Sequence, residues 1–328
     1  MQTWTVRRLL EWADNFFNVK GISQPRLSAE LLLSSVLNLS RMQLFLNYDY
    51  ILKDNQLATF KGHILKRLEH VPIQYILNET YFRNLKLYVD RNVLIPRPET
   101  ELLVDKAILI LRKILRENTP NNKAINILEI GTGSGAIALS IASEIGNLIE
   151  RGRFNNNTKE ESGNKNALFE NFRIIATDIN AGALEIARKN AKKILKDDTA
   201  KKIEFKNCDI VPDGDKKFNE EFGGKLNIVI SNPPYISEED YENLPREVRD
   251  YEPREALLAG KTGLEFYKKI LHKIKPYLNV SNCYLIFETD PKVSTMLKEL
   301  LQKEINPKSI EIDRDYNQRD RIVTVKII

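Results

Sequence analysis

From about residue 99 onward, the sequence alternates short apolar runs with stretches of helical periodicity, and this alternation restricts the fold more than any other feature. The apolar runs cover 125–130, 173–177, 202–205, 226–231 and 284–288. Alternation of this kind predicts an α/β fold, a doubly wound and mainly parallel sheet with helices on both faces. The last stretch, 309–328, is typical of two strands joined by a tight polar turn, so we expect a seven-stranded Rossmann-like sheet closed by an antiparallel pair.

A different pattern precedes this region. Between residues 6 and 70, apolar residues recur at helical spacing, as in Val6, Leu9 and Leu10, which predicts a small helical domain. From residue 71 to 98 the sequence is rich in Pro, Asn and aromatic residues with short alternating runs, which indicates a β-hairpin linker. We therefore expect a helical domain at 1–77, a linker at 78–98 and the α/β domain at 99–328.

Composition limits the class of protein and the ligands that can be expected. The chain has 328 residues, 42% hydrophobic and 29% charged, as expected for a globular protein. Its 50 basic and 45 acidic residues are spread along the sequence, which neither excludes nor indicates binding to nucleic acid. The two cysteines and three histidines lack the spacing of metal ligands, so no metal is predicted.

The start of the chain carries no sign of export. Arg7, Arg8, Glu11 and Asp14 interrupt any run that could form the apolar core of a signal peptide. Because no stretch of 18 consecutive apolar residues occurs either, we expect no membrane segment and a cytoplasmic location.

One segment interrupts the alternation. Residues 146–171 are rich in Asn, Lys, Glu and Gly and offer little apolar surface for a core. We expect a mobile surface insertion, and a loop that touches a macromolecular substrate is the alternative.

A glycine-rich turn lies directly after the first predicted strand of the sheet and directly before a helix. In LEIGTGSGAIALSIA, Gly131, Gly133 and Gly135, with Thr132 and Ser134 between them, let the backbone turn sharply and approach a ligand. Many such turns carry glycines for packing alone, but the strand before this one favours a ligand site. Glu129, two residues before the first glycine, is placed to accept a hydrogen bond from a cationic amino group.

The next two strands also end in acids. Asp178 is predicted to accept hydrogen bonds from ribose hydroxyls, with the N-cap of a helix near Ala181 as the alternative. It follows Gly131 by 47 residues rather than the usual ~20, and the insertion accounts for the difference. After the third strand, Asp209 and Ile210 are placed to contact an adenine ring, although a core role for Ile210 is equally open.

The most specific motif follows the fourth strand, where 226–231 runs into Asn232, Pro233, Pro234 and Tyr235. Consecutive prolines fix φ and lack an N–H, so the turn presents carbonyl oxygens. If the Asn232 side-chain oxygen and the Pro233 carbonyl accept the two hydrogens of an NH₂ group, its nitrogen is held for reaction. Tyr235 can then pack against the flat group. We predict these four residues to be catalytic, whereas the alternative is a surface turn stiffened by prolines.

Several motifs together resemble the peptide chain release factor glutamine methyltransferases. They are PIQYIL (72–77), LIPRPETELLV (94–104), LEIGTGSGAIAL (128–139), ISNPPYI (230–236) and YEPREALLAGKTGLEFYKKI (251–270). The resemblance covers nearly the whole chain. It implies a class I S-adenosylmethionine-dependent fold and N5-methylation of the glutamine in the Gly-Gly-Gln motif of translation release factors, with the N-terminal helices recognising the substrate.

The resemblance also implies roles for single residues. Gly131 to Gly135, Asp178, Ile210 and Asn232 would contact S-adenosylmethionine, whose methionine end suits Glu129 better than a pyrophosphate would. Asn232 to Tyr235 would hold the substrate glutamine. Arg97, Pro98 and Glu99 lie in the linker, which in such proteins approaches the cofactor, and we include Arg97 and Glu99 among the substrate-binding candidates. The partners would be release factors, with no membrane and no direct nucleic acid required.

One departure from the family pattern is FETDPK (287–292), where a glutamate, a glycine and a glutamine are usual; we expect it to affect only local helix packing. Rival functions stay open. A ribosomal-protein glutamine methyltransferase would share the main motifs, and adenine-N6 methyltransferases of nucleic acids use a similar turn. The turn after the fourth strand argues against a nicotinamide oxidoreductase, and an intact Asn232 argues against a silent binding module.

Overall fold

The computed structural model describes residues 3–117, 125–150, 172–212, 214–279 and 283–327. Contacts divide the chain into two compact units. The helical unit comprises Met1–Glu79 with Leu244–Tyr251, and the sheet unit comprises Thr80–Asn243 with Glu252–Ile328. The excursion at 244–251 has no counterpart in the sequence-based division, whose boundaries at 77 and 98 stay predictions.

The helical unit is built on amphipathic helices. Val6, Leu9, Leu10, Ala13 and Phe17 form the buried face of α1, whose N-cap Thr5 accepts a hydrogen bond from the Arg8 N–H. This spacing of apolar residues places one face of the helix against its neighbours. The helices of the unit are α1 (Val6–Val19), α2 (Pro25–Leu37), α3 (Arg41–Leu46), α4 (Asp54–Leu68), α5 (Ile73–Leu77) and, from the excursion, α13 (Arg246–Arg249).

An ion pair between a buried arginine and a partly exposed glutamate holds the excursion within the helical unit. The side chain of Arg67 on α4 is 3% exposed and lies 2.8 Å from Glu247 on α13. Its guanidinium also donates to the Val71 carbonyl and to the Ser23 hydroxyl. Because an unpaired guanidinium is costly to bury, Glu247 compensates the charge that the helices alone would leave isolated.

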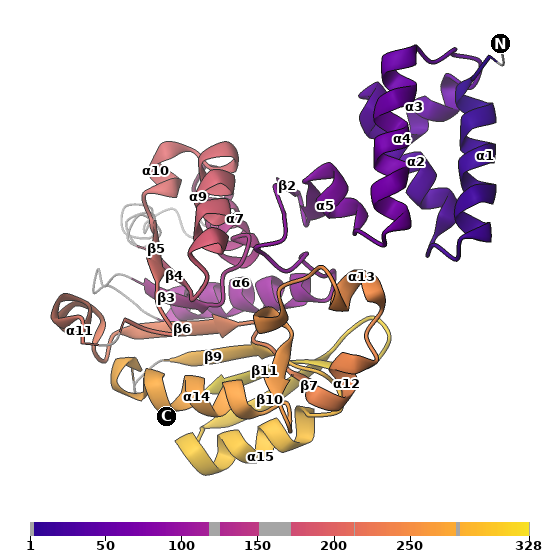
Figure 1. Ribbon diagram of the computed structural model, residues 1–328. Coiled ribbons are helices and arrows are strands. Elements are labelled where there is room, and N and C mark those ends of the chain that lie inside the picture. The colour runs from indigo at the N-terminus through magenta and orange to yellow at the C-terminus, as the bar shows by residue number, and fades with distance from the viewer. Residues whose placement is uncertain (1–2, 118–124, 151–171, 213, 280–282, 328) are drawn as a thin grey trace. The chain divides into compact units, whose positions relative to one another are not determined.

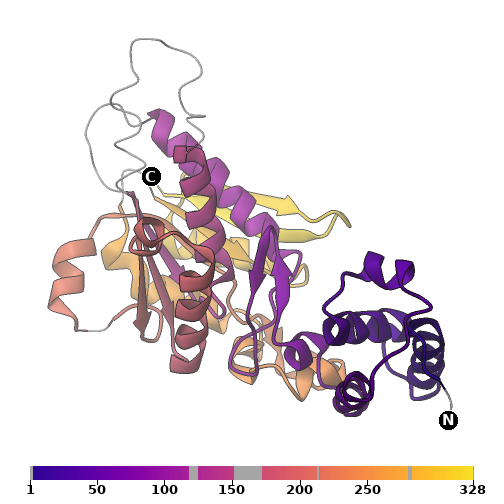
Figure 2. The same ribbon diagram turned by 90° about the horizontal axis from the view of Figure 1, so that it is seen from above.

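The sheet unit contains the predicted doubly wound sheet. Its strand order is β10-β11-β9-β6-β3-β4-β5, with β10 and β11 antiparallel and the strands from β9 to β5 parallel. The strands are β3 (Ile125–Ile130), β4 (Phe172–Asp178), β5 (Ile203–Asn207), β6 (Leu226–Ser231), β9 (Tyr284–Glu288), β10 (Ser309–Arg314) and β11 (Asp320–Lys326). The predictions of seven strands and of a closing antiparallel pair are both confirmed, and Figure 2 shows that yellow pair at one end of the sheet.

Helices cover both faces of the sheet (Figure 1). Neighbouring residues of β3 point to opposite faces, so Ile127 packs with α6, α7 and α9, while Leu128 packs with α11, α14 and α15. Strands buried on both sides need continuous apolar sequence, which explains the unbroken runs in the chain. These helices are α6 (Thr100–Glu117), α7 (Ala136–Glu150), α9 (Ala181–Ile194), α11 (Lys216–Phe222), α14 (Glu265–Ile274) and α15 (Ser294–Ile305).

Shorter elements complete the unit. The predicted hairpin in the linker is present as β1 (Thr80–Phe82) paired antiparallel with β2 (Leu85–Leu87). A second small sheet pairs β7 (Ile236–Ser237) with β8 (Leu258–Gly260) and so ties the turn after β6 to a later loop. The remaining short helices are α10 (Asp197–Ala200), α12 (Glu238–Glu242), η1 (Arg254–Ala256) and η2 (Lys275–Tyr277).

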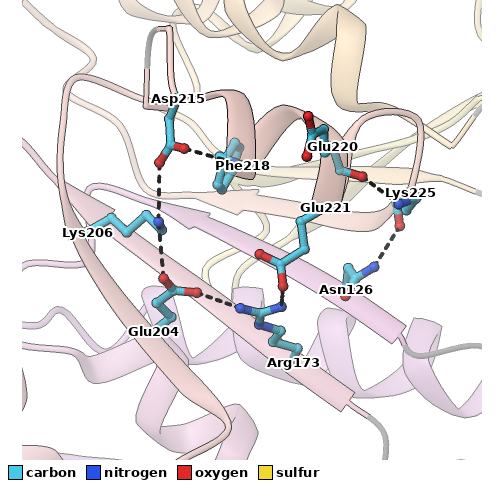
Figure 3. Close-up of polar contacts among 9 residues, drawn as sticks. All are labelled: Asn126, Arg173, Glu204, Lys206, Asp215, Phe218, Glu220, Glu221 and Lys225. Carbon is cyan, nitrogen blue, oxygen red and sulfur yellow. Dashed lines mark hydrogen bonds and ion pairs between the residues drawn. The ribbon is translucent and has the colours of Figure 1, made fainter.

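Charged side chains bridge the edge strand β5 and the helix α11 (Figure 3). Arg173 on β4 lies 2.8 Å from Glu204 on β5 and 2.5 Å from Glu221 on α11. Lys206 on β5 contacts Glu204 and Asp215, and Asp215 caps α11. Charges on an edge strand discourage pairing with another chain, so this network both attaches α11 and protects the edge.

The Asn-rich segment begins later than expected. Residues 146–150 form the last turns of α7, and the rest of the predicted insertion, 151–171, lies outside the described residues. Among the described residues, no helix combines the length and apolar character needed to cross a membrane. Over the same ranges, no group of three or more His, Cys, Asp or Glu is placed to hold a metal ion.

Candidate active site

A pocket opens at the carboxyl ends of β3 and β6, between which the order of the sheet reverses. Doubly wound sheets bind ligands at this switch point, because the helices that follow the two strands leave on opposite faces. The lining comes from the linker, from the turns after β3, β4, β5 and β6, from the loop before β8 and from α14. All of these belong to the sheet unit.

The three glycines of the first turn divide into two kinds. Gly131 and Gly133 line the pocket with φ of 72° and 54°, and a Cβ on either would meet no atom within 4 Å. Gly135, with φ of 84°, does not line the pocket, and a Cβ there would lie 3.1 Å from Leu139 and 3.3 Å from Ala187. The first two therefore leave space for a ligand, whereas the third is required for packing.

Thr132, Ser134 and Glu129 lie behind the turn rather than in the lining. The fully buried Glu129 accepts hydrogen bonds at Oε2 from the Thr132 hydroxyl, at 2.7 Å, and from the Ala138 N–H in the first turn of α7, at 3.2 Å. Its Oε1 has no partner among the described residues, and burial raises the pKa of its carboxyl to about 8. Glu129 thus stabilises the start of α7, and its contact with a ligand amino group stays a prediction.

Asp178 faces the pocket and organises its floor. Its Oδ2 accepts the Gly133 N–H at 2.8 Å, and its Oδ1 accepts the Asn180 N–H at 2.9 Å. The N-cap of α9 is Asn180, whose side chain accepts from the Gly182 N–H, so the capping alternative for Asp178 is wrong. Each carboxylate oxygen keeps a lone pair for a ligand hydroxyl. Burial raises the pKa of Asp178 above its usual value.

The turn after β5 is held in a strained conformation. Ile210 has φ of 76°, and the Val211 N–H donates to the Asp209 carbonyl at 3.0 Å, which makes a γ-turn of the positive-φ form. A β-branched residue there costs on the order of 1–3 kcal/mol. The Thr177 hydroxyl stabilises the turn by donating to the Ile210 carbonyl at 2.9 Å. Ile210 packs in the core and also lines the pocket, so its core role is confirmed and its contact with an adenine ring stays a prediction.

Asp209 also lines the pocket, with its carboxylate anchored from behind. Lys269 and Lys273 on α14 lie 2.8 Å and 3.3 Å from its Oδ2. Burial acts to raise the pKa of Asp209, but the hydrogen bonds and charges of the two lysines hold it below its usual value. The acid therefore stays ionised and fixed beside the strained turn.

Asn232, Pro233 and Pro234 form the opposite wall of the pocket. Both prolines are buried, and Ser231, the last residue of β6, donates from its hydroxyl to the Ile130 carbonyl at 2.8 Å. The Asn232 Nδ2 donates to the Thr100 Oγ1 at 3.1 Å. Asn232 is thus fixed at its amide nitrogen, which leaves the side-chain oxygen as the available acceptor.

Tyr235 does not line the pocket. Its hydroxyl donates to Oε1 of Glu288, at the end of β9, over 3.4 Å, and burial raises the pKa of the phenol. Glu288 is only 1% exposed and lies in the segment expected to affect local helix packing alone. Glu288 matches the glutamate of the family pattern, so this contact does not test the expectation, which concerns the missing glycine and glutamine. The role of Tyr235 as a platform for the substrate stays a prediction.

The linker candidates have partners of their own. Arg97 lies 2.6 Å from the buried Glu252, whose other oxygen accepts the Ile95 N–H at 3.1 Å. This pair joins the linker to the loop before β8 within the sheet unit. Glu99 is half-buried just before α6. Neither residue lines the pocket, so substrate binding by Arg97 and Glu99 stays a prediction.

Sequence reasoning missed several lining residues. Asn92 and Leu94 come from the linker, Glu255 from the loop before β8 and Phe266 from α14. The glycine turn and strand ends gave no signal for them, because their place depends on where loops far apart in the sequence meet. The only hint was that these residues lie within or next to two of the quoted motifs, 94–104 and 251–270.

The lining has a clear electrostatic character. It contains Asp178, Asp209 and Glu255, and within the described part of the chain it contains no Lys or Arg. A pyrophosphate would meet the negative charge of Asp178 and Glu255, whereas the charge of Asp209 is compensated by Lys269 and Lys273. A nucleoside with a cationic end fits better, so the residues present suit S-adenosylmethionine and disfavour a nicotinamide dinucleotide.

Comparisons with known proteins match both the helical and the α/β regions of the chain. A family model described as the PrmC N-terminal domain matches residues 8–77, and an RMKL-like methyltransferase domain model matches 131–244. A protein named release factor glutamine methyltransferase from Chlorobaculum tepidum is 34% identical over 98% of this chain and 96% of its own length. Proteins of the same name from Rhodopirellula baltica and Bacillus subtilis are 32% and 30% identical, each over 98% of this chain and over 96% and 98% of their own lengths. With identity at this level along almost its entire length, the chain belongs to the release factor glutamine methyltransferase family.

Proposed function

We propose that this protein uses S-adenosylmethionine to methylate the side-chain amide nitrogen, N5, of the glutamine in the Gly-Gly-Gln motif of translation release factors. The observation that carries the proposal is the placement of Asn232. Its amide nitrogen is tied to Thr100, and the side chain stands on the wall of a pocket suited to a cationic nucleoside. Relatives that share nearly the whole chain carry the corresponding name.

The chemistry explains why such a wall is needed. An amide nitrogen is a poor nucleophile because its lone pair is delocalised into the carbonyl group. S-adenosylmethionine, when bound, supplies a methyl group on a positively charged sulfur. The Asn232 Oδ1 and the Pro233 carbonyl accept the two amide hydrogens and so hold the nitrogen with its open face toward the methyl group. Orientation of this kind can contribute up to ~7–11 kcal/mol.

No strong base is required in this scheme. As the carbon–nitrogen bond forms, the nitrogen becomes acidic, and one of its two hydrogens leaves as a proton. The acceptor-lined turn favours that loss, because two consecutive prolines place no N–H beside the developing positive charge.

We assign the recognition of the release factor to the helical domain, 1–77, and cofactor binding to 99–328, with 78–98 as the linker. In this assignment release factors are the partners, nucleic acid is not required, and the enzyme acts in the cytoplasm with the translation machinery.

The test is methyl transfer from tritiated S-adenosylmethionine to three substrates in parallel: a release factor, ribosomal protein and DNA. We expect label in the release factor only, and none when its Gly-Gly-Gln glutamine is replaced by alanine. Faster labelling of ribosomal protein or of DNA would overturn the proposal in favour of the corresponding rival.

A further inference from the structure

The linker forms one wall of the pocket, to which Asn92, Val93 and Leu94 contribute. The wall is attached to the rest of the sheet unit at Tyr88, the residue that follows β2. The Tyr88 N–H donates to the Asn190 Oδ1 at 2.8 Å, and the Tyr88 carbonyl accepts from the Asn190 Nδ2 at 3.0 Å. The asparagine side chain therefore satisfies both backbone groups of residue 88, as a neighbouring strand would in a sheet.

Asn190 also reaches the glycine-rich turn. Its Nδ2 donates to the Ser134 carbonyl at 2.9 Å. An asparagine amide has two hydrogens on its nitrogen and acceptor lone pairs on its oxygen, so the three bonds use both hydrogens and the oxygen. A flipped amide would set its oxygen against two carbonyls, which fixes the orientation. One side chain thus joins the linker wall to the turn from which Gly131 and Gly133 line the pocket.

The position of Asn190 in the fold has no other evident explanation. It is 0% exposed and lies inside α9, where asparagine is an unfavourable residue for a helix. It does not line the pocket, so it can act on a ligand only through its partners. The N-cap of the same helix, Asn180, donates from its Nδ2 to the Asn92 carbonyl at 3.1 Å. The helix α9 therefore holds the linker at both ends of the segment 88–92.

We propose that Asn190 is a positioning residue for the cofactor, which holds the linker wall and the glycine-rich turn in the arrangement that S-adenosylmethionine requires. Walls that are fixed in advance do not have to be ordered when the ligand binds, and this raises affinity. Because such coupling is reciprocal, a cofactor that binds between the walls stabilises the Asn190 contacts in turn. The proposal rests on cofactor binding and is independent of which protein is methylated.

The first experiment measures hydrogen exchange in the wild-type chain without release factor. The Tyr88 amide donates to a buried side chain and should exchange slowly, and saturating S-adenosylmethionine should slow it by a further 10-fold or more. The matched control is the Asn126 amide, which donates at 3.0 Å to another buried asparagine, Asn227, at the amino ends of β3 and β6, away from the pocket. Equal slowing at the two amides, or none at Tyr88, would overturn the proposal.

The second experiment removes the three bonds with Asn190→Leu. Calorimetry should show that the Kd for S-adenosylmethionine rises about 10-fold, the scale of one buried polar group left without a partner. The Kd for S-adenosylhomocysteine should rise by the same factor, since the two molecules differ only in the methyl group and its charge. In release factor methylation, the KM for S-adenosylmethionine should rise similarly, while kcat at saturating cofactor stays within about twofold.

Asn227→Leu separates a role in cofactor binding from a role in stability alone. It also removes a buried asparagine that accepts a backbone N–H, but at the other edge of the sheet, so both Kd values should stay within about twofold of the wild type. Unchanged Kd values in Asn190→Leu, equal changes in the two variants, or a fall in kcat without a rise in KM would contradict the proposal. If Asn190→Leu does not fold, the exchange experiment decides, because it needs no variant.

Discussion

The proposed reaction depends above all on one atom, the side-chain oxygen of Asn232. In Asn232→Ala both prolines remain to shape the turn, so the sheet unit should fold and retain at least part of its cofactor affinity. Methyl transfer to the release factor should fall by ~10²-fold or more, as for the loss of one positioned polar group elsewhere. Single-turnover kinetics measure the chemical step, and a wild-type rate in this variant would show that the site is misassigned.

Asp178 is expected to act on binding rather than on the chemical step. Asp178→Ala removes the acceptor of ribose hydroxyls and also of the Gly133 N–H. The free energy of S-adenosylmethionine binding should become less favourable by ~1–3 kcal/mol. The loss should be smaller in Asp178→Asn, which keeps one acceptor oxygen. Calorimetry without added metal measures both variants. Tighter binding of NADH than of S-adenosylmethionine by the wild type would refute the cofactor assignment.

At this scale the sequence identified the wall and floor of the pocket but not what supports them. Gly131, Asp178 and Asn232 could be predicted because they follow strands whose ends meet at one edge of a parallel sheet. Gly135 and Glu129 fit the same motif yet lie behind it, since the motif does not reveal which way each residue faces. Thr100 could not be predicted as a contact of Asn232, because nothing in the sequence relates residues 132 positions apart.

The elements of the fold were more predictable than the contacts between them. The apolar run at 226–231 coincides with β6, and that at 284–288 with β9, because strands buried on both faces need uninterrupted apolar sequence. Residues 244–251 were not predicted to join the helical unit. Their short polar helix has no apolar periodicity that would indicate a partner. It is held by the pairing of Glu247 with Arg67 and by the hydrogen bond from the Tyr251 hydroxyl to the Glu69 carbonyl.

The ion pairs that attach α11 offer a test at this scale. Arg173 and Glu221 are 36% and 38% exposed, so water screens their attraction. A double-mutant cycle with Arg173→Met and Glu221→Gln should give a coupling free energy below ~1 kcal/mol that shrinks further in high salt. Denaturant unfolding measures it. A coupling free energy of several kcal/mol would mean that the pair is far better shielded from water. The control is S-adenosylmethionine binding, which should be unchanged in both variants.

The stability of the whole molecule should depend on two buried carboxyls. Burial raises the pKa of Glu129 to about 8 and that of Glu288 to about 7, from an ordinary value of 4.5. Groups facing Glu288 modify this, since Arg321 lowers its pKa and Glu99 raises it. The folded state binds these protons more tightly than the unfolded state, so proton binding stabilises the folded protein. This contribution to the free energy of unfolding is complete below about pH 4.5 and is lost as pH rises through about 7 and 8.

Unfolding of the cofactor-free protein in denaturant at pH 5.5 and pH 8 checks this dependence. The wild-type free energy of unfolding should fall over this range, and Glu129→Gln should reduce the fall by about 1–3 kcal/mol, given ~1.4 kcal/mol for each pKa unit. Glu299→Gln, at an exposed position on α15, is the control and should leave the pH dependence unchanged. An identical fall in wild type and Glu129→Gln would show that Glu129 is ionised in the folded protein.

The pairing of Arg67 with Glu247 also bears on how the chain matures during its own synthesis. The two partners are separated by 180 residues. At roughly 5–20 residues per second, the ribosome adds Glu247 about 9–36 s after Arg67. During that interval the nascent helices hold a guanidinium whose carboxylate has not yet been made, so their packing cannot be completed. The helical unit is therefore finished only after several strands of the sheet have been synthesised.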